Sequence, residues 1–386
     1  MKYQNETTYL EDDGKYYKWK HPFYGTMLTS FGQSFTMIFS FIKRRNDRRK
    51  AQVVKDLNGT EVEGSQSEEQ KKLDYRLLAV PAICDQIENS TKNITLTLIA
   101  ASITQMLRSA AVVFTAILAV LFLKQKLHRQ HWTGVLSIVV GVLFVGMSVP
   151  SGNSNYLAIG IMLVGQICGA TGYILEEKYL GDFDSMDPYM MAGIEGVWGT
   201  ILWLILLPIL EHIPCNPAEG ICTRNGTFEN SLNVFREYSR NPMNIVLSII
   251  IVGFMPLLYG SALNITQYGS AAARTTVETA RNFMIWGFFL FVPVYGRIIE
   301  KFSILQFTGF MILIFGVLLY NEMIVLPCCG FAYNTKINKI KRKHDNDFSK
   351  NKMMSMASTD AGQYQDLETM ESNLINKSSD DSVLRY

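Results

Sequence analysis

Long apolar segments separated by short polar ones dominate the pattern of the chain. The stretch from Trp132 to Leu175 contains no charged residue, and only the polar turn 150–155, Pro-Ser-Gly-Asn-Ser-Asn, interrupts it. Because a helix needs about 20 predominantly apolar residues to cross a bilayer, this stretch predicts two transmembrane spans joined by a short loop. Helices in the core of a soluble protein are not so uniformly apolar over such a length. The pattern therefore predicts an all-α, polytopic membrane protein.

The same rule predicts nine spans along the chain. They cover about residues 22–42, 77–96, 98–123, 132–149, 156–175, 189–210, 243–267, 275–296 and 304–326. The second span is weak by hydropathy because Asp85, Glu88 and Lys92 interrupt it. If it does cross, the basic clusters after the first, third and last spans fall on one side of the membrane, as the positive-inside rule requires. We therefore expect nine spans, a cytoplasmic C-terminus and, because nine is odd, a luminal N-terminus.

Composition agrees with this class and argues against an enzyme. Of the 386 residues, 48% are hydrophobic and only 18% charged, which is too apolar for a soluble protein of this length. The histidines fall at span edges or in the tail, so neither a buried Ser-His pair nor a His-ligated metal is expected. A Walker loop is also absent, so ATP is not the expected energy source. We predict no enzymatic activity, no metal and no cofactor, and nucleic acid is not an expected partner.

A short signature occurs twice. Residues 133–143 read Thr-Gly, six apolar or small residues and Gly-Val-Leu, and residues 308–318 repeat this order. Upstream of each copy lies another apolar run that begins near an arginine, Arg108 in the first case and Arg281 in the second. Duplicated pairs of membrane-length helices are typical of transporters built from structural repeats.

The fifth predicted span carries a different pattern. The small residues of 165–172 form a flat ridge, which predicts close packing against another helix.

Three charges in the eighth predicted span share one helical face. Arg274, Glu278 and Arg281 are spaced i, i+4, i+7. An ionisable residue near the bilayer centre costs about 2.5–3.5 kcal/mol, so such residues face a partner or a water-filled cavity. We expect Glu278 and Arg281 to line a cavity in which the arginines are available to an anionic group. Arg274 is expected to reach the lipid headgroups instead.

Other buried charges complete the candidate substrate site. By the internal repeat, Arg108 corresponds to Arg281 and should lie near the same central cavity. Asp85 and Glu88 are about one turn apart and could neutralise Arg108 and carry a proton, or form a fixed ion pair that holds two helices together. Glu195 in the sixth span is also expected at the cavity. The predicted substrate-binding residues are Asp85, Glu88, Arg108, Glu195, Glu278 and Arg281.

Loops and the tail carry candidate modification and sorting sites. Cys215 and Cys222 flank a loop that the topology places in the lumen, where they either form a disulfide or remain free thiols. Asn225 begins an Asn-Gly-Thr glycosylation sequence in the same loop. Beyond residue 334 the tail is polar and expected to be disordered, and Tyr364 and Leu367 form a Tyr-x-x-Leu sequence of the kind read by sorting adaptors.

These features divide the chain into four parts. They are a polar N-terminal segment, 1–21; a first transmembrane repeat, 22–149, with a cytoplasmic loop at 43–74; a second transmembrane repeat, 155–327, with a luminal loop at 212–242; and a cytoplasmic tail, 328–386.

Several stretches resemble a known family. They are His21-Pro22-Phe23, Pro81-Ala82-Ile83-Cys84-Asp85, Gln105-Met106-Leu107-Arg108, Leu175-Glu176-Glu177-Lys178, and the region from Ala280-Arg281-Asn282 through Tyr320-Asn321. In these residues the chain resembles the drug/metabolite transporter superfamily, specifically solute carrier family 35, subfamily F, and the related chloroquine-resistance transporters. The resemblance implies the EamA-like fold of two inverted five-helix repeats, with both termini cytoplasmic, a central cavity and alternating access. The resemblance implies a first helix before His21, where only about twenty polar residues stand, so we expect either that the start of the chain lies further upstream or that the protein lacks this helix.

The residues and the resemblance together predict a secondary active transporter of a small organic solute in a lysosomal or vacuolar membrane, with coupling to protons through a carboxylate. Import of nucleotide sugars into the Golgi, with arginines meeting a diphosphate, is a second interpretation. A membrane scaffold or sorting protein without transport activity is the third.

Overall fold

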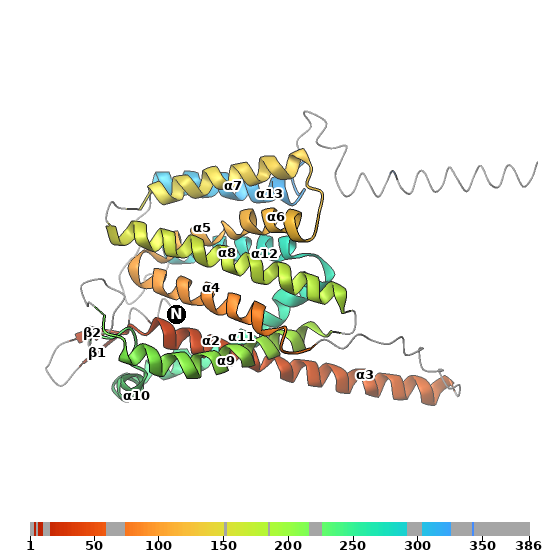
Figure 1. Cartoon of the computed structure of the whole chain (residues 1–386), viewed down its shortest axis with the longest axis horizontal. Coiled ribbons are helices and arrows are strands. Elements are labelled where there is room, and N and C mark those ends of the chain that lie inside the picture. Colours follow the sequence, from red (N-terminus) through yellow and green to blue (C-terminus); the bar gives the residue numbers. More distant parts are fainter. Residues whose placement is uncertain are drawn as a thin grey trace, which may run out of the picture. The chain divides into compact units, whose positions relative to one another are not determined.

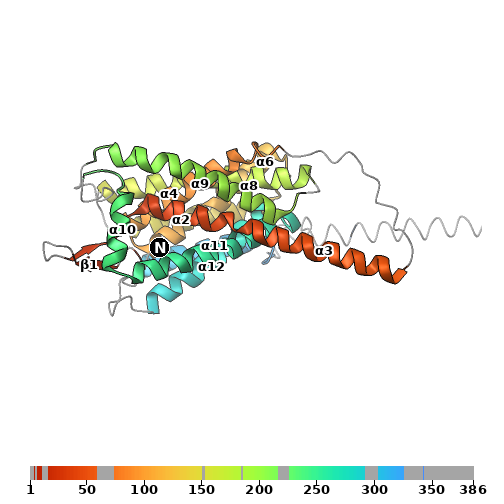
Figure 2. The same ribbon diagram turned by 90° about the horizontal axis from the view of Figure 1, so that it is seen from below.

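The structure is a computed structural model that describes residues 4, 7–10, 16–58, 74–149, 153–183, 186–215, 226–291, 303–325 and 342. One compact unit, Met1–Met323, contains helices that run side by side (Figures 1 and 2). They are α2 (Pro22–Ser34), α3 (Thr36–Asn58), α4 (Ala79–Leu98), α5 (Ala101–Arg108), α6 (Ala111–Phe122), α7 (Arg129–Met147), α8 (Asn153–Asp182), α9 (Pro188–His212), α10 (Ser231–Arg240), α11 (Met243–Tyr268), α12 (Ala271–Phe291) and α13 (Ile304–Tyr320). Within the described ranges, five helical segments are long and apolar enough to cross a membrane: 101–122, 129–147, 156–182, 188–212 and 243–268. The prediction of an all-α polytopic membrane protein is confirmed.

Helix α3 corrects one expectation. It follows α2 after a break at Phe35 and continues to Asn58, so residues 43–58 are helical where a loop was expected. The physical reason is composition, because this segment contains neither proline nor glycine and is rich in lysine and arginine, which are good helix formers. As a result α3 extends past the ends of the neighbouring α9 and α11 (Figures 1 and 2).

The third predicted span is a broken helix. α5 ends at Arg108 and α6 begins at Ala111. At the break the backbone turns tightly, because Ser109 and Ala110 donate to the carbonyls of residues three positions earlier, at 3.0 Å each. The hydroxyl of Ser109 is buried and has no hydrogen-bond partner among the described residues. Discontinuous helices of this kind place backbone groups and side chains at the binding sites of transporters, and here the break directly follows an arginine.

The duplicated signature forms a single helix–helix interface. α7 and α13 pack antiparallel, because a Cβ at Gly134 would lie 2.7 Å from the backbone nitrogen of Tyr320, and one at Gly141 would lie 2.7 Å from that of Leu313. The relation is reciprocal: a Cβ at Gly316 would lie 2.8 Å from the backbone nitrogen of Ile138. The two copies of the signature therefore face each other, and their glycines allow the backbones to approach.

The small-residue ridge of α8 packs in the same way against α4, as predicted. A Cβ at Gly165 would overlap the side chain of Thr91, and one at Gly169 would overlap that of Glu88. A Cβ at Gly172 would lie 3.2 Å from that of Cys84. This close contact sets the distance at which Glu88 reaches across from α4 toward α8.

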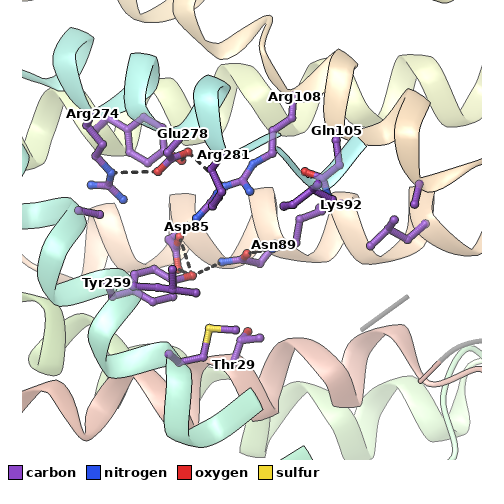
Figure 3. Close-up of a pocket in the computed structure, with 17 residues that line it drawn as sticks. Thr29, Asp85, Asn89, Lys92, Gln105, Arg108, Tyr259, Arg274, Glu278 and Arg281 are labelled. Carbon is purple, nitrogen blue, oxygen red and sulfur yellow. Dashed lines mark hydrogen bonds and ion pairs between the residues drawn. The ribbon is translucent and has the colours of Figure 1, made fainter. Parts of the chain in front are cut away.

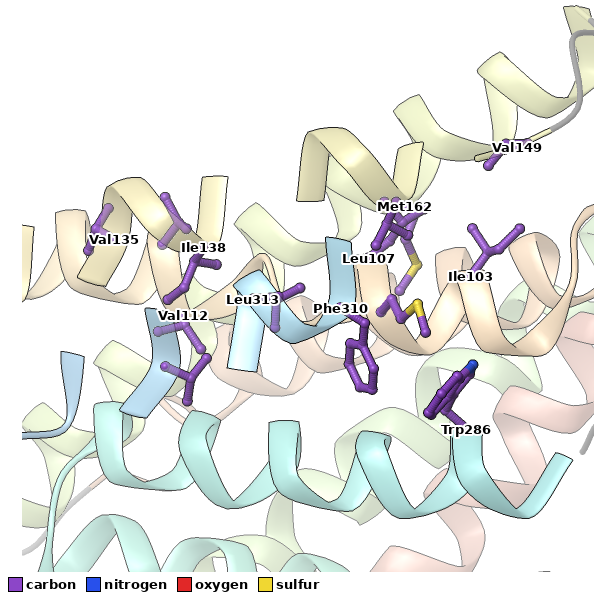
Figure 4. Close-up of a cluster of buried hydrophobic side chains, with 14 of the residues drawn as sticks. Ile103, Leu107, Val112, Val135, Ile138, Val149, Met162, Trp286, Phe310 and Leu313 are labelled. Atoms are coloured by element: carbon purple, nitrogen blue, oxygen red, sulfur yellow. The ribbon is translucent and has the colours of Figure 1, made fainter. Parts of the chain in front are cut away.

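A buried apolar cluster joins α5, α6, α7, α8, α12 and α13 (Figure 4). Met106, Leu107, Ile138, Phe310 and Leu313 are fully buried within it. The indole of Trp286 contacts Phe310 edge-on, with ring centroids 5.4 Å apart. The cluster holds the two helices that carry the duplicated signature against the broken helix α5–α6.

Two elements outside the predicted spans were not anticipated. Residues Thr8–Leu10 (β1) and Tyr16–Lys18 (β2) form an antiparallel hairpin. The connection between α9 and α11 contains the short helix α10. Trp19 stacks on Tyr238 of α10 at 5.2 Å between ring centroids, so the N-terminal segment packs on this helix.

His21 is the centre of a buried ionic cluster at this end of the unit. Its Nδ1 lies 2.6 Å from Glu229 Oε1, and its Nε2 lies 3.1 Å from Glu237 Oε2. The second oxygen of Glu229 accepts the backbone N–H groups of Phe23 and Tyr24 at the start of α2. Burial by itself lowers the pKa of His21, but the hydrogen bonds and Coulombic attraction of the two carboxylates outweigh it and raise that pKa to about 9.

This cluster predicts a specific dependence of stability on pH. Because the folded-state pKa of His21 is raised from 6.5 to about 9, its contribution is fully present below about pH 6.5 and is lost as the pH rises through about 9. The contribution corresponds to about 3 kcal/mol. Thermal unfolding of the detergent-solubilised protein, followed from neutral to alkaline pH, should show this loss. His21→Gln should remove it, and a parallel decline in both proteins would contradict the role of His21.

Candidate functional site

A cavity of about 300 Å³ lies between helices of both predicted repeats (Figure 3). Residues of α2, α4, α5, α8, α11 and α12 line it. Its charged lining residues are Asp85, Lys92, Arg108, Arg274, Glu278 and Arg281. Apolar side chains, among them Leu96, Met255, Leu258 and Ile285, complete the wall. The cavity therefore offers both a cationic and an apolar surface to one ligand, as small-molecule sites commonly do.

Helical periodicity positions the polar wall. On α12 the residues Arg274, Glu278, Arg281 and Ile285 line the cavity at i, i+4, i+7 and i+11. α4 presents Asp85, Asn89, Lys92 and Leu96 with the same spacing, and α5 presents Ala101, Gln105 and Arg108 at i, i+4 and i+7. Three helices thus direct one face each toward the cavity. The structure places the stripe of the eighth span along the cavity wall, and its role in binding stays a prediction.

Arg108 pairs with one carboxylate of each predicted repeat. Its Nε lies 3.2 Å from Glu88 Oε1 on α4, and its Nη2 lies 3.3 Å from Glu278 Oε2 on α12. The hydroxyl of Tyr173 on α8 donates to the other oxygen of Glu88 at 2.7 Å. Arg108 is therefore held by two carboxylates, and its guanidinium is already committed within the protein.

Arg274 does not reach the lipid headgroups, which corrects the expectation for this residue. It is 3% exposed and forms an ion pair with Glu176 of α8. Its Nε also lies 3.3 Å from Glu278 Oε1, and its guanidinium carbon lies 4.1 Å from the ring centroid of Tyr173. The physical reason is the buried carboxylate of Glu176, which provides a partner inside the protein. This pair joins α8 to α12 at one end of the cavity.

Arg281 is different from the other two arginines. It lines the cavity from the middle of α12, and no ion pair or hydrogen bond of its side chain is found in the described part of the chain. Glu278, one turn earlier on the same face, is engaged by Arg108 and Arg274 instead. Arg281 is thus a cation at the cavity wall whose guanidinium donors are available to a ligand.

Comparisons with known proteins agree with this architecture. The model of the EamA-like transporter family matches residues 63–147. An uncharacterized protein of Schizosaccharomyces pombe is 31% identical over 253 residues, which cover 65% of this chain and 75% of that protein. Solute carrier family 35 member F6 of Mus musculus is 27% identical over 315 residues, covering 80% of this chain and 79% of the relative. The Homo sapiens protein of the same name is 28% identical over 255 residues, covering 64% and 67%.

The chain belongs to the drug/metabolite transporter superfamily. Within it, the similarity places the chain with solute carrier family 35, subfamily F, as the resemblance predicted. It is a membrane transporter of the solute carrier type, with a small solute as substrate and the lipid bilayer as its environment.

The solute carrier's cavity includes four of the six predicted substrate-binding residues: Asp85, Arg108, Glu278 and Arg281. Glu88 lies behind this wall, where it holds Arg108. Glu195 is buried on α9, but α9 contributes no residue to the cavity, because its glycine face packs against α2, α3 and α4. For Glu88 the fixed ion pair is the arrangement found, and for Glu195 the expected position at the cavity is wrong.

Asp85 is the cavity carboxylate with the fewest partners in this solute carrier. Tyr259 Oη on α11 lies 3.3 and 3.4 Å from its two oxygens, and Gln86 Nε2 lies 3.3 Å from one of them. Tyr259 in turn accepts from Asn89 Nδ2 at 2.8 Å. Asp85 is 8% exposed and forms no ion pair with any described residue. It is therefore held by neutral hydrogen-bond donors.

Sequence reasoning missed Lys92, Asn89, Tyr259 and Glu176 as parts of the site. A signal for the first two was present, since they continue the one-face spacing that begins at Asp85. Tyr259 and Glu176 lie on other helices, so no periodicity connects them to it.

The predicted disulfide, glycosylation and sorting sites lie mostly outside the described residues. Cys215 is disulfide-bonded, but Cys222 lies outside the described residues, so the predicted pairing stays a prediction. Asn225, Tyr364 and Leu367 also lie outside the described residues. In the transmembrane region Cys84 and Cys168 are free thiols.

Proposed function

We propose that this solute carrier is a secondary active transporter, not an enzyme, and moves a small organic solute with an anionic group by alternating access. The observation that carries the proposal is Arg281, an uncommitted guanidinium at the wall of a cavity between the two predicted repeats. A carboxylate or phosphate of the solute would pair with this guanidinium through two parallel hydrogen bonds. The apolar wall formed by Met255, Leu258 and Ile285 would contact the rest of the solute.

Access to the cavity supports this interpretation. The lining reaches Leu96 and Ala101, at the junction of α4 and α5, which the predicted topology assigns to the luminal side. Toward the other side, the buried pair of Arg274 and Glu176 joins α12 to α8. Opening the cavity toward the cytoplasm would require this pair to separate, which makes it a candidate gate for alternating access.

Asp85 is the candidate for proton coupling. It lines the same cavity and has no cationic partner in the described ranges, so protonation breaks no ion pair. A carboxylate of this kind can take up a proton on one side of the membrane and release it on the other. Such coupling would suit an acidic compartment, and we propose a lysosomal or vacuolar membrane.

Reconstituted flux tests the proposal. The purified protein would be placed in proteoliposomes and supplied with labelled organic anions, organic cations or nucleotide sugars, with and without a proton gradient. We expect uptake of an organic anion that the proton gradient stimulates. Uptake of nucleotide sugars would favour the Golgi interpretation, although among the described residues only one cavity arginine is uncommitted for a diphosphate. No flux of any solute class, even with a first helix supplied, would favour the scaffold.

A further inference from the structure

Helix α3 carries a strongly basic face where it leaves the bundle. Residues 43–50 read Lys-Arg-Arg-Asn-Asp-Arg-Arg-Lys, and every side chain among them is exposed. The preceding side chains, Ile38, Phe39, Phe41 and Ile42, are apolar and also exposed, as expected for residues that face lipid. The arginines therefore follow directly on the part of the helix that faces the membrane interior.

The arginines are not spread around the helix. Arg44, Arg45, Arg48 and Arg49 line one hollow of about 520 Å³ together with Phe41 and Gln52. Their spacing from Phe41 is i+3, i+4, i+7 and i+8, which places all of them on one face. None of the four arginines forms an ion pair or hydrogen bond within the described part of the chain.

The opposite face of α3 is occupied by the protein itself. Ser40 Oγ donates to Asp187 Oδ2 at 2.5 Å, and Lys43 Nζ lies 3.1 Å from Asp187 Oδ1. The same ammonium group lies 5.7 Å from the ring centroid of Tyr189. These contacts fix the rotation of α3 about its axis, so that the arginine face points away from α9.

We propose that this arginine face binds an anionic phospholipid whose headgroup carries phosphomonoesters. Four guanidinium groups within about two helical turns can make several bidentate hydrogen bonds with phosphate oxygens. The position commits the site to a membrane lipid, because Phe41 and the exposed apolar residues before it lie where the glycerol and acyl chains of that lipid would be. Basic residues immediately next to a transmembrane helix attract anionic lipids of the adjacent leaflet.

The same residues also satisfy the positive-inside rule, which requires only their charge and not their arrangement. A role limited to topology predicts no preference among anionic lipids. A binding site predicts that the arginine face matters more than an equal charge elsewhere on α3. Lys50 provides the matched control, because it is exposed, carries one positive charge and lies outside the hollow.

Binding can be measured without depending on membrane insertion. The full-length protein in detergent would be titrated with fluorescent phosphatidylinositol bisphosphate, and separately with fluorescent phosphatidylserine, in mixed micelles. We expect the bisphosphate lipid to bind at least about tenfold more tightly. The single substitution Arg48→Gln should weaken this binding about fivefold, and the pair Arg44→Gln and Arg48→Gln about thirtyfold.

Lys50→Gln should weaken binding less than Arg48→Gln. The second pair, Arg45→Gln and Arg49→Gln, should reproduce the loss seen with the first. Because these side chains are exposed and have no partner among the residues that the structure describes, their replacement should leave the thermal unfolding temperature unchanged. Equal losses for Arg48→Gln and Lys50→Gln, or equal affinities for the two lipids, would overturn the proposal.

Discussion

Replacing Arg281 with Gln is expected to abolish solute flux while leaving the protein folded. The guanidinium lines the cavity and has no ion pair in the described part of the chain, so its removal leaves no buried carboxylate without a partner. A bound anionic group would lose its charged partner, which costs about 2–5 kcal/mol in a buried site. This corresponds to a loss of affinity of about 30- to 4000-fold. Flux into proteoliposomes and thermal unfolding of the same preparation would measure the two effects separately.

Arg108→Gln is the matched control for this experiment. Both arginines line the cavity, but Arg108 neutralises Glu88 and Glu278. Its replacement should therefore lower thermal stability as well as flux, because the buried Glu88 loses its cationic partner and Glu278 keeps only Arg274. Arg281→Lys should retain part of the flux, since the charge remains while the bidentate geometry is lost. If flux persists at the wild-type level in Arg281→Gln, the assignment of the cavity as the substrate site is wrong.

Replacing Gly141 with Leu is expected to prevent stable folding. A Cβ at this position would already lie 2.7 Å from the backbone nitrogen of Leu313 and 2.8 Å from the carbonyl oxygen of Gly309. Backbone atoms of α13 cannot move aside as a flexible side chain can, so α7 and α13 would have to separate. Separation would open the buried cluster around Ile138 and Phe310. We expect a destabilisation of about 4 kcal/mol or more.

Gly146 offers a control on the same helix. Among the described residues, no atom outside the adjoining part of α7 lies within 4 Å of a Cβ built at this glycine, so Gly146→Leu should unfold at or above the wild-type temperature. Fluorescence-detected size exclusion after heating would compare the two variants. Similar unfolding temperatures for Gly141→Leu and Gly146→Leu would show that the glycine interface between α7 and α13 does not control stability.

Hydropathy and helical spacing predicted the parts of the site that belong to one helix. The stripe of Arg274, Glu278 and Arg281 is such a case, because three residues on one face stay on one face in any packing arrangement. The repeated glycines were predicted as a sign of duplication, and the structure adds that the two copies pack against each other.

Predictions failed where the outcome depended on a second helix. Arg274 was expected at the headgroups because the sequence does not show that Glu176, 98 positions earlier, lies beside it. Glu195 was expected at the cavity because it is a charged residue within a predicted span. Such a position predicts burial, and Glu195 is buried, but it does not show which helices line the cavity.

The sequence by itself determined the class of the protein, the approximate extent of its membrane helices and the face on which each helix carries its charges. These properties follow from local periodicity and from the free energy of placing each residue in a bilayer. Only the tertiary structure decided which charges are paired with one another and which, like Arg281, line the cavity without an ion pair among the described residues. Pairing depends on distances of a few ångströms between helices far apart in the chain. The glycine contacts of α4 with α8 and of α7 with α13 set such distances, and no single helix encodes them.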